Sequence, residues 1–113
     1  MKQELISILE TFGYPVRLQG SLAPDEQYPA SFFTFWNFDS TDGNHYDNRP
    51  VSVNWYFTVN FYSVDPDLVQ SVTESAIDKL KAAGWIIDGR GNDVDSGKIT
   101  HTGRTFDASY MKY

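Results

Sequence analysis

Residues 51 to 62 read Val-Ser-Val-Asn-Trp-Tyr-Phe-Thr-Val-Asn-Phe-Tyr, which is the strongest structural signal in the chain. Every odd-numbered position is apolar, whereas the even-numbered positions hold Ser, Asn, Tyr, Thr, Asn and Tyr. Because successive side chains of a strand point to opposite faces, this alternation predicts a long strand with one buried face. Tyr56 and Tyr62 would lie on the opposite, more polar face.

A helix is predicted directly after this strand, from Leu68 to Ala83. Asp65 suits the N-cap, and Pro66 suits the first helical position. Apolar residues then recur at helical spacing, and Gly84 supplies a C-terminal stop. We expect this helix to cover the apolar face of the 51–62 strand, because both surfaces would otherwise stay in water.

The remaining sequence predicts one more helix and four more strands. The helix is expected at residues 1–12, and the strands are expected at 14–19, 31–38, 85–88 and 98–112. Polar segments at 39–50 and 89–97 are expected to be turns or loops, and Gly103 would mark a bulge. The order is therefore α-β-β-β-α-β-β in one α+β domain over residues 1–113. Its sheet is expected to be mainly antiparallel or mixed, with two helices packed on one face.

Aromatic residues make up 16% of the chain, and many fall in the 31–38 and 51–62 strands. The 31–38 strand is apolar on both alternating faces, yet two helices can cover only one face of a sheet. We expect Phe33 and Phe35 (or the residues on the opposite side of that strand) on the uncovered face, together with Tyr56 and Tyr62. Either the sheet curls on itself or another subunit buries that face, and the size of the patch favours the second.

Charge and composition exclude several classes of partner. Nine Lys and Arg residues against fifteen Asp and Glu give a net charge of -6, and the basic residues are scattered. Phosphate binding needs clustered cations, so no nucleic-acid partner is expected. No apolar run reaches the ~20 residues of a membrane span, so no membrane partner is expected. The absence of cysteine excludes disulfides, zinc-thiolate sites and thiol nucleophiles.

No combination of residues in the sequence predicts an enzyme. His45 and His101 are the only histidines, and neither belongs to a motif that supplies a nucleophile or an orienting partner. We therefore expect no catalytic and no cofactor-binding residues. The acidic segments 39–44 and 93–97 place carboxylates near glycine, but ordinary turn chemistry explains them and no metal site is expected.

The chain resembles the tail-completion proteins of long-tailed bacteriophages and prophages, the tail terminator and head-tail joining group. The resemblance rests on a strand ending in residues 59–66, the helix 68–83, the turn Ala83-Gly84-Trp85 and a closing strand through Gly103. It implies a subunit of a homo-oligomeric ring, commonly a hexamer, that caps the tail tube. The implied partners are further copies of the chain, the tail tube protein and the head connector. The implied location is the virion, after assembly in the host bacterial cytoplasm.

On this interpretation the aromatic face forms the contacts between subunits, and charged loop residues set their orientation at the rim. The expected interaction residues are Phe33, Phe35, Tyr56, Tyr62, Arg90, Asp93 and Asp95. The alternative is a small monomeric binding module that stacks exposed aromatics such as Trp36 or Tyr56 on a sugar or an apolar ligand. A small hydrolase ranks last, because no nucleophile and base are paired.

Overall fold

The computed structural model describes residues 2–18, 30–42, 45–46, 49–50, 53–94 and 101–112. Helices and strands follow one another as α1 (Lys2–Glu10), β1 (Val16–Leu18), β2 (Ser31–Asp42), β3 (His45–Tyr46), β4 (Arg49–Pro50), β5 (Val53–Ser63), α2 (Pro66–Ala82), β6 (Asn92–Val94) and β7 (Thr102–Lys112). Two helices and one mixed sheet of five strands form an α+β fold, which confirms the predicted fold class.

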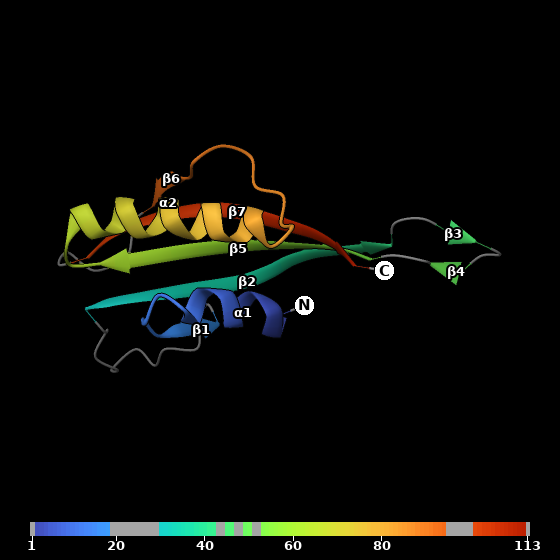
Figure 1. Ribbon diagram of the computed structural model, residues 1–113, viewed down its shortest axis with the longest axis horizontal. Coiled ribbons are helices and arrows are strands. Elements are labelled where there is room, and N and C mark those ends of the chain that lie inside the picture. The colour runs from blue at the N-terminus through green and yellow to red at the C-terminus, as the bar shows by residue number, and fades with distance from the viewer. Residues whose placement is uncertain are drawn as a thin grey trace.

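The sheet has the order β1-β2-β5-β7-β6, so the strand with the clearest alternation lies at its centre. β1 runs parallel to β2, and every other pairing in the sheet is antiparallel. β3 and β4 form a separate two-stranded ribbon at one end of the long axis, away from both helices (Figure 1). The molecule measures 53 × 29 × 22 Å along its principal axes.

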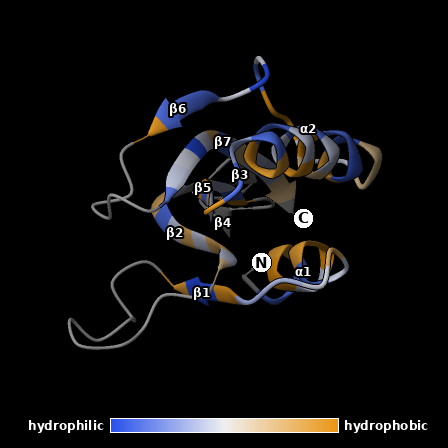
Figure 2. Ribbon diagram, turned by 90° about the vertical axis from the view of Figure 1, so that its left-hand side faces the viewer, coloured by the Kyte–Doolittle hydropathy of each residue, from blue (hydrophilic) through white to orange (hydrophobic). Residues whose placement is uncertain are grey.

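Both helices pack on the same face of the sheet, as predicted (Figure 2). The odd-numbered residues of β5 point toward them, and Phe57, Val59 and Phe61 are fully buried. Val53 and Trp55, nearer the start of the strand, are only partly buried. The helices contribute the other side of this core, with Leu5, Leu9, Val69, Val72, Ala76, Ile77 and Leu80.

The ends of α2 follow the predicted signals. The side chain of Asp65 accepts a hydrogen bond from the backbone N–H of Asp67 at 3.0 Å, and Pro66 occupies the first turn. Gly84 has a φ of +98°, a left-handed conformation that residues with a Cβ rarely adopt. The Trp85 N–H then donates to the Leu80 carbonyl at 3.0 Å, which satisfies one of the last carbonyls of the helix.

The prediction for the faces of β2 is wrong. Phe33 and Phe35 lie in the core beneath the helices rather than on the uncovered face. The antiparallel ladder places Phe33 opposite Phe61, with ring centroids 4.7 Å apart, and Phe35 opposite Val59. Directly opposed residues share a face, so the register with β5 determines which side of β2 is buried. The strand's own pattern is apolar on both sides and could not determine it.

Three further local predictions need correction. β2 continues to Asp42 and the β3–β4 ribbon follows it, so the 39–50 segment is not one long loop. Residues 85–88, predicted as a strand, form only an isolated bridge from Ile86 to Ser109. A short strand, β6, lies instead within the 89–97 segment that was predicted to be a turn. The β5–β7 ladder is unbroken at Gly103, whereas the register shift lies in β2 between Asn37 and Asp39.

The Tyr62 ring lies directly against Gly103 and leaves no room for a side chain there. A Cβ at this position would come within 2.5 Å of Tyr62 Cδ1 and 3.0 Å of Val94 Cγ1. Tyr62 is its partner across the β5–β7 ladder, and β6 lies beside it on the other side. The close packing of three strands at this point therefore depends on the missing side chain.

Replacing Gly103 with alanine should destabilise the fold by about 1–3 kcal/mol, the range for overpacking a close contact. Urea unfolding would measure the change in the free energy of unfolding. Most of the cost should disappear in a Tyr62→Ala background, because the ring that a new Cβ would contact is gone. Equal costs in both backgrounds would contradict the proposed clash.

Replacing Phe57 with alanine should lower the free energy of unfolding by ~3–5 kcal/mol, because Phe57 is fully buried beneath α2. Trp36→Ala is the matched control, since Trp36 lies on the opposite face with half of its surface exposed. It should change stability by only about 0.5 kcal/mol. A Phe57→Ala protein as stable as the control would show that this face of β5 is not the core.

Candidate functional site

The face of the sheet opposite both helices is here called the helix-free face. At one end of this face the side chains pack against one another and are largely buried. Phe32 is buried there, with its ring centroid 5.3 Å from that of Tyr62 and 6.0 Å from that of His101. Thr34 and Asn60 are also buried, and Asn60 Nδ2 donates to Thr34 Oγ1 at 3.1 Å. Tyr62 therefore lies on the predicted face, but it packs within the subunit.

The other end of the helix-free face is exposed and apolar. The exposed fractions of four side chains there are 50% for Trp36, 47% for Phe38, 68% for Ile86 and 40% for Met111. Tyr56 lies beside Phe38, with the two ring centroids 6.0 Å apart. These five residues, here called the aromatic patch, form the kind of exposed apolar surface that marks an interaction site.

Strand pairing explains why the patch forms where it does. The register shift in β2 lets Phe38 contact Tyr56, and Asn37 Nδ2 donates to the Tyr56 carbonyl at 2.9 Å. On the other side of β5, Tyr56 is paired with Ser109, which is in turn paired with Ile86. One row of residues thus crosses the sheet from β2 to the 85–88 segment.

The orientation of the 85–88 segment follows from its alternation. Trp85 and Ile87 are buried in the helix-side core, so Ile86 and Asp88 face the other way. Two backbone hydrogen bonds between Ile86 and Ser109, at 2.8 and 3.0 Å, hold the segment against the edge of β7. A hydrophobic side chain and a carboxylate are thereby placed beside the aromatic patch.

A groove of about 240 Å³ lies between these elements, and we call it the acidic groove. Its apolar walls and its two carboxylates come from four segments, with lining residues Phe38, Tyr56, Ile86, Asp88, Asp107, Ala108 and Ser109. Asp107 accepts a hydrogen bond from Thr58 Oγ1 at 2.9 Å, which orients one of the carboxylates. Such a groove can accept a group that is apolar along its length and positively charged at its tip.

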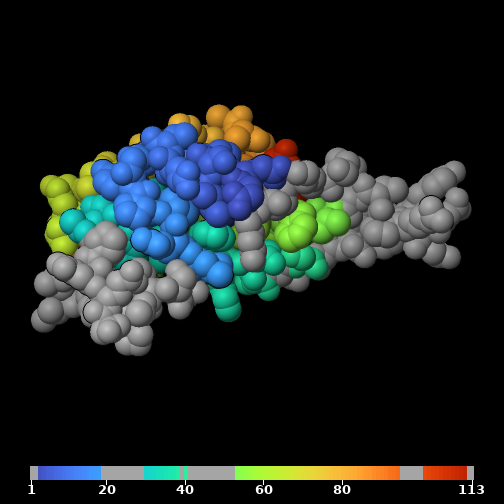
Figure 3. Space-filling model, turned by 90° about the horizontal axis from the view of Figure 1, so that it is seen from below, coloured from blue at the N-terminus to red at the C-terminus, as the bar shows by residue number. Residues whose placement is uncertain are grey.

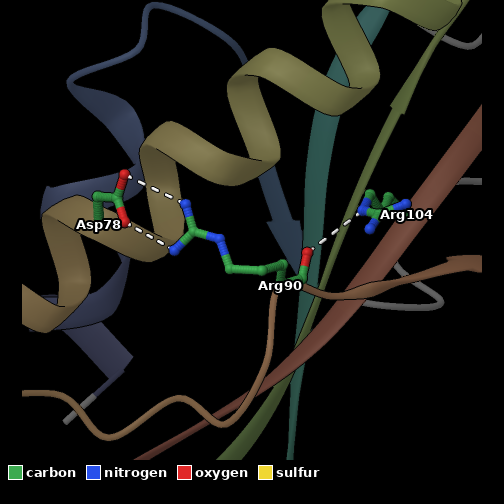
Figure 4. Close-up of polar contacts among 3 residues, drawn as sticks. All are labelled: Asp78, Arg90 and Arg104. Atoms are coloured by element: carbon green, nitrogen blue, oxygen red, sulfur yellow. Dashed lines mark hydrogen bonds and ion pairs between the residues drawn. The ribbon is translucent and has the colours of Figure 1, made fainter.

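The charged residues predicted at the rim take part in contacts within the subunit. Arg90 pairs with Asp78 at 2.9 Å, and Asp93 pairs with Arg104 at 3.0 Å. Arg104 also donates to the Arg90 carbonyl at 3.3 Å (Figure 4). It donates to the Gly91 carbonyl as well, at 3.1 Å. These contacts attach the loop before β6 to α2 and β7. The part played by Arg90 and Asp93 in an interface stays a prediction.

Asp95, the remaining predicted rim residue, lies outside the described residues. A second depression, of about 380 Å³, lies near Val69, His101 and Arg104, but its arginine is already held by Asp93 and two carbonyls. Among the described residues, no three His, Asp or Glu side chains are grouped as a metal site would require. None of the described helices is long and apolar enough to cross a membrane.

The structure therefore brings together a different set of residues from the predicted one. Of the four aromatics predicted for the ring contacts, only Tyr56 joins the exposed patch, and Trp36, which was named for the alternative binding module, lies there too. Sequence reasoning missed Phe38, Ile86, Asp88 and Asp107 as neighbours of Tyr56. The alternation of residues 85–88 was a usable signal for Ile86 and Asp88. No local pattern, however, places that segment beside β7.

The pKa of Asp78 lies below its ordinary value of 3.8, mainly because Arg90 donates a hydrogen bond to its carboxylate. Arg90→Ala should raise this pKa toward 3.8, and carbon-detected NMR titration would measure the change. Since folding lowers the pKa, the pair stabilises the fold above pH 3.8, and this contribution is lost as the pH falls through the folded-state pKa. Lys81→Ala is the control and should shift the pKa less, because Lys81 acts through its charge alone. An unchanged Asp78 pKa in Arg90→Ala would contradict the pairing.

Neither a scan against protein-family models nor a search of curated proteins finds a match to this sequence.

Proposed function

We propose that this protein is a virion assembly component of a bacteriophage or prophage, a tail terminator or head-tail joining protein that forms a ring capping the tail tube. The observation that carries the proposal is the exposed aromatic patch on the helix-free face. The succession of elements that resembles the tail-completion group supports it. On this proposal the protein has a structural role and no catalytic one.

The energetic argument starts from the exposed area of the patch. Buried aromatic side chains remove 150–250 Å² each from water, so half-exposed Trp36 and Phe38 leave roughly 100 Å² each in water. Ile86 and Met111 add further apolar area beside them. Burial of such area, at ~25 cal/mol per Å², favours association with another protein surface. Aromatic residues at the centre of a contact also contribute most of the binding energy in many interfaces.

The outline of the molecule suits a ring subunit. β2 and β5 run together beyond the helices, and the β3–β4 ribbon lies at the end of that extension (Figure 1). An extension of this kind can contact a neighbour outside the reach of the subunit body. The other end of the molecule carries the compact layer of two helices, and α1 and β1 form a continuous surface in the space-filling view (Figure 3).

Capping would work by a difference between the two surfaces of the ring. One surface would match the last ring of the tail tube, and the other would lack the contacts needed to add more tube protein. A head-to-tail contact between identical subunits closes only when its rotation divides the full circle. The geometry of that contact would therefore set the copy number.

The acidic groove favours one other candidate, a monomeric module that binds a small ligand. Its volume of about 240 Å³ is below the ~300–1,000 Å³ typical of small-molecule sites, and Trp36 does not line it. Solution mass separates the two functions, because a ring has several times the 12.9 kDa of one chain. A solution mass of several chains, together with no measurable sugar binding, would favour the assembly function.

Deletion of the coding sequence from its parent phage, followed by electron microscopy of the lysate, tests the proposed function. We expect tail tubes of abnormal length together with filled, unattached heads. Supplying the wild-type protein from a plasmid should restore infectious particles, whereas a Trp36→Asp, Phe38→Asp variant should not, because it places charge in the proposed interface. Normal infectious particles after the deletion would contradict the proposal.

A further inference from the structure

The two edges of the sheet differ in charge. β1 forms one edge, and the 85–88 segment and β6 lie beside β7 at the other edge (Figure 2). The second edge carries the acidic groove, with the carboxylates of Asp88 and Asp107 next to Phe38, Tyr56 and Ile86. The first edge carries an exposed arginine, Arg17, at the middle of β1.

Most described cations are already engaged within the subunit. Lys79 donates to Thr11 Oγ1 at 2.7 Å and lies 5.5 Å from the centroid of the Phe12 ring. Arg90 and Arg104 form the ion pairs described above. Among the side chains that the structure describes, this leaves Arg17 and Lys81 without a hydrogen bond or an ion pair.

Arg17 and the groove face the same side of the sheet. Arg17 is paired with Thr34, whose side chain lies on the helix-free face, whereas its neighbour Val16 packs against the core. Strand alternation therefore directs Arg17 toward the helix-free side. Lys81 belongs to α2, which covers the opposite face. Of the two available cations, only Arg17 is on the side of the acidic groove.

The chemistry of the groove matches a guanidinium group. Two carboxylates can accept its N–H donors in a forked arrangement, and the aromatic rings of Phe38 and Tyr56 can pack against its flat face. The methylene stem of an arginine can lie along Ile86.

We propose that β1 of one copy docks at the acidic groove of a second copy, with Arg17 between Asp88 and Asp107. The two surfaces lie at opposite edges of one sheet, so each subunit offers one of each and the contact is head-to-tail. Repetition of such a contact gives a closed ring when its rotation divides the circle. This contact rests on the proposed function, since it is the contact between subunits of the proposed ring.

Disulfide trapping tests the contact, because the chain contains no cysteine of its own. A protein carrying Arg17→Cys is mixed at high concentration with one carrying Asp88→Cys, and the mixture is oxidised. We expect a cross-linked heterodimer to form, with far less homodimer from either variant alone. The matched control replaces Arg17→Cys with Lys81→Cys, another exposed cation, and should give only background cross-linking. Equal cross-linking by both pairs would overturn the proposal.

Charge exchange supplies a second test that requires no cross-link. Arg17→Glu should weaken self-association at least about tenfold in sedimentation velocity, because it brings like charges together. The combination of Arg17→Glu with Asp88→Arg and Asp107→Arg should restore much of that loss, whereas Lys81→Glu should have little effect. Circular dichroism would verify that each variant is folded.

The outcomes separate this contact from the proposed function. Wild-type self-association in Arg17→Glu would overturn the docking of β1 while leaving a ring built on another contact. No self-association of the folded wild-type protein at any concentration would overturn the docking contact as well. In that case the phage deletion decides the proposed function independently, because its phenotype does not depend on how subunits contact one another.

Discussion

The antiparallel register between β5 and its two neighbours determines which side chains are buried throughout the sheet. It aligns Phe57, Val59 and Phe61 with the odd-numbered residues of β2 and the even-numbered residues of β7. A shift of one residue would move each of these side chains to the other face. Both helices then find a continuous apolar surface on one side, and their burial stabilises the register in turn.

That same register determines what remains exposed. Phe32, Trp36 and Tyr56 must face away from the helices once Phe33, Phe35 and Phe57 face toward them. At the end of this face near Phe32 the side chains pack against one another within the subunit. At the end near Trp36 and Phe38 the aromatic side chains stay exposed to water. β2 is apolar on both faces, and only one of these faces can lie beneath the helices. The exposed patch is a direct consequence, because the apolar residues of the other face stay in water.

Charge is arranged around this surface in two different ways. The ion pairs of Asp78 with Arg90 and of Asp93 with Arg104 stay within the subunit and hold the loop before β6 in place. Asp88 and Asp107 lie at a groove whose apolar walls can pack against a cationic side chain. On the proposed function the subunits associate with one another, and such local complementarity would offset the net charge of -6, which opposes assembly.

The sequence by itself determined the elements whose signals are local: the alternating β5, the capped helix α2 with its glycine stop, and the α+β class. It could not determine the faces of β2, since a strand with phenylalanines on both sides fits either register. Nor could it place residues 85–88 beside β7, because that contact joins segments more than twenty residues apart. Local propensity and alternation are properties of a single segment. The exposed patch and the acidic groove arise from pairing between segments that are distant in the chain, so no single segment could predict them.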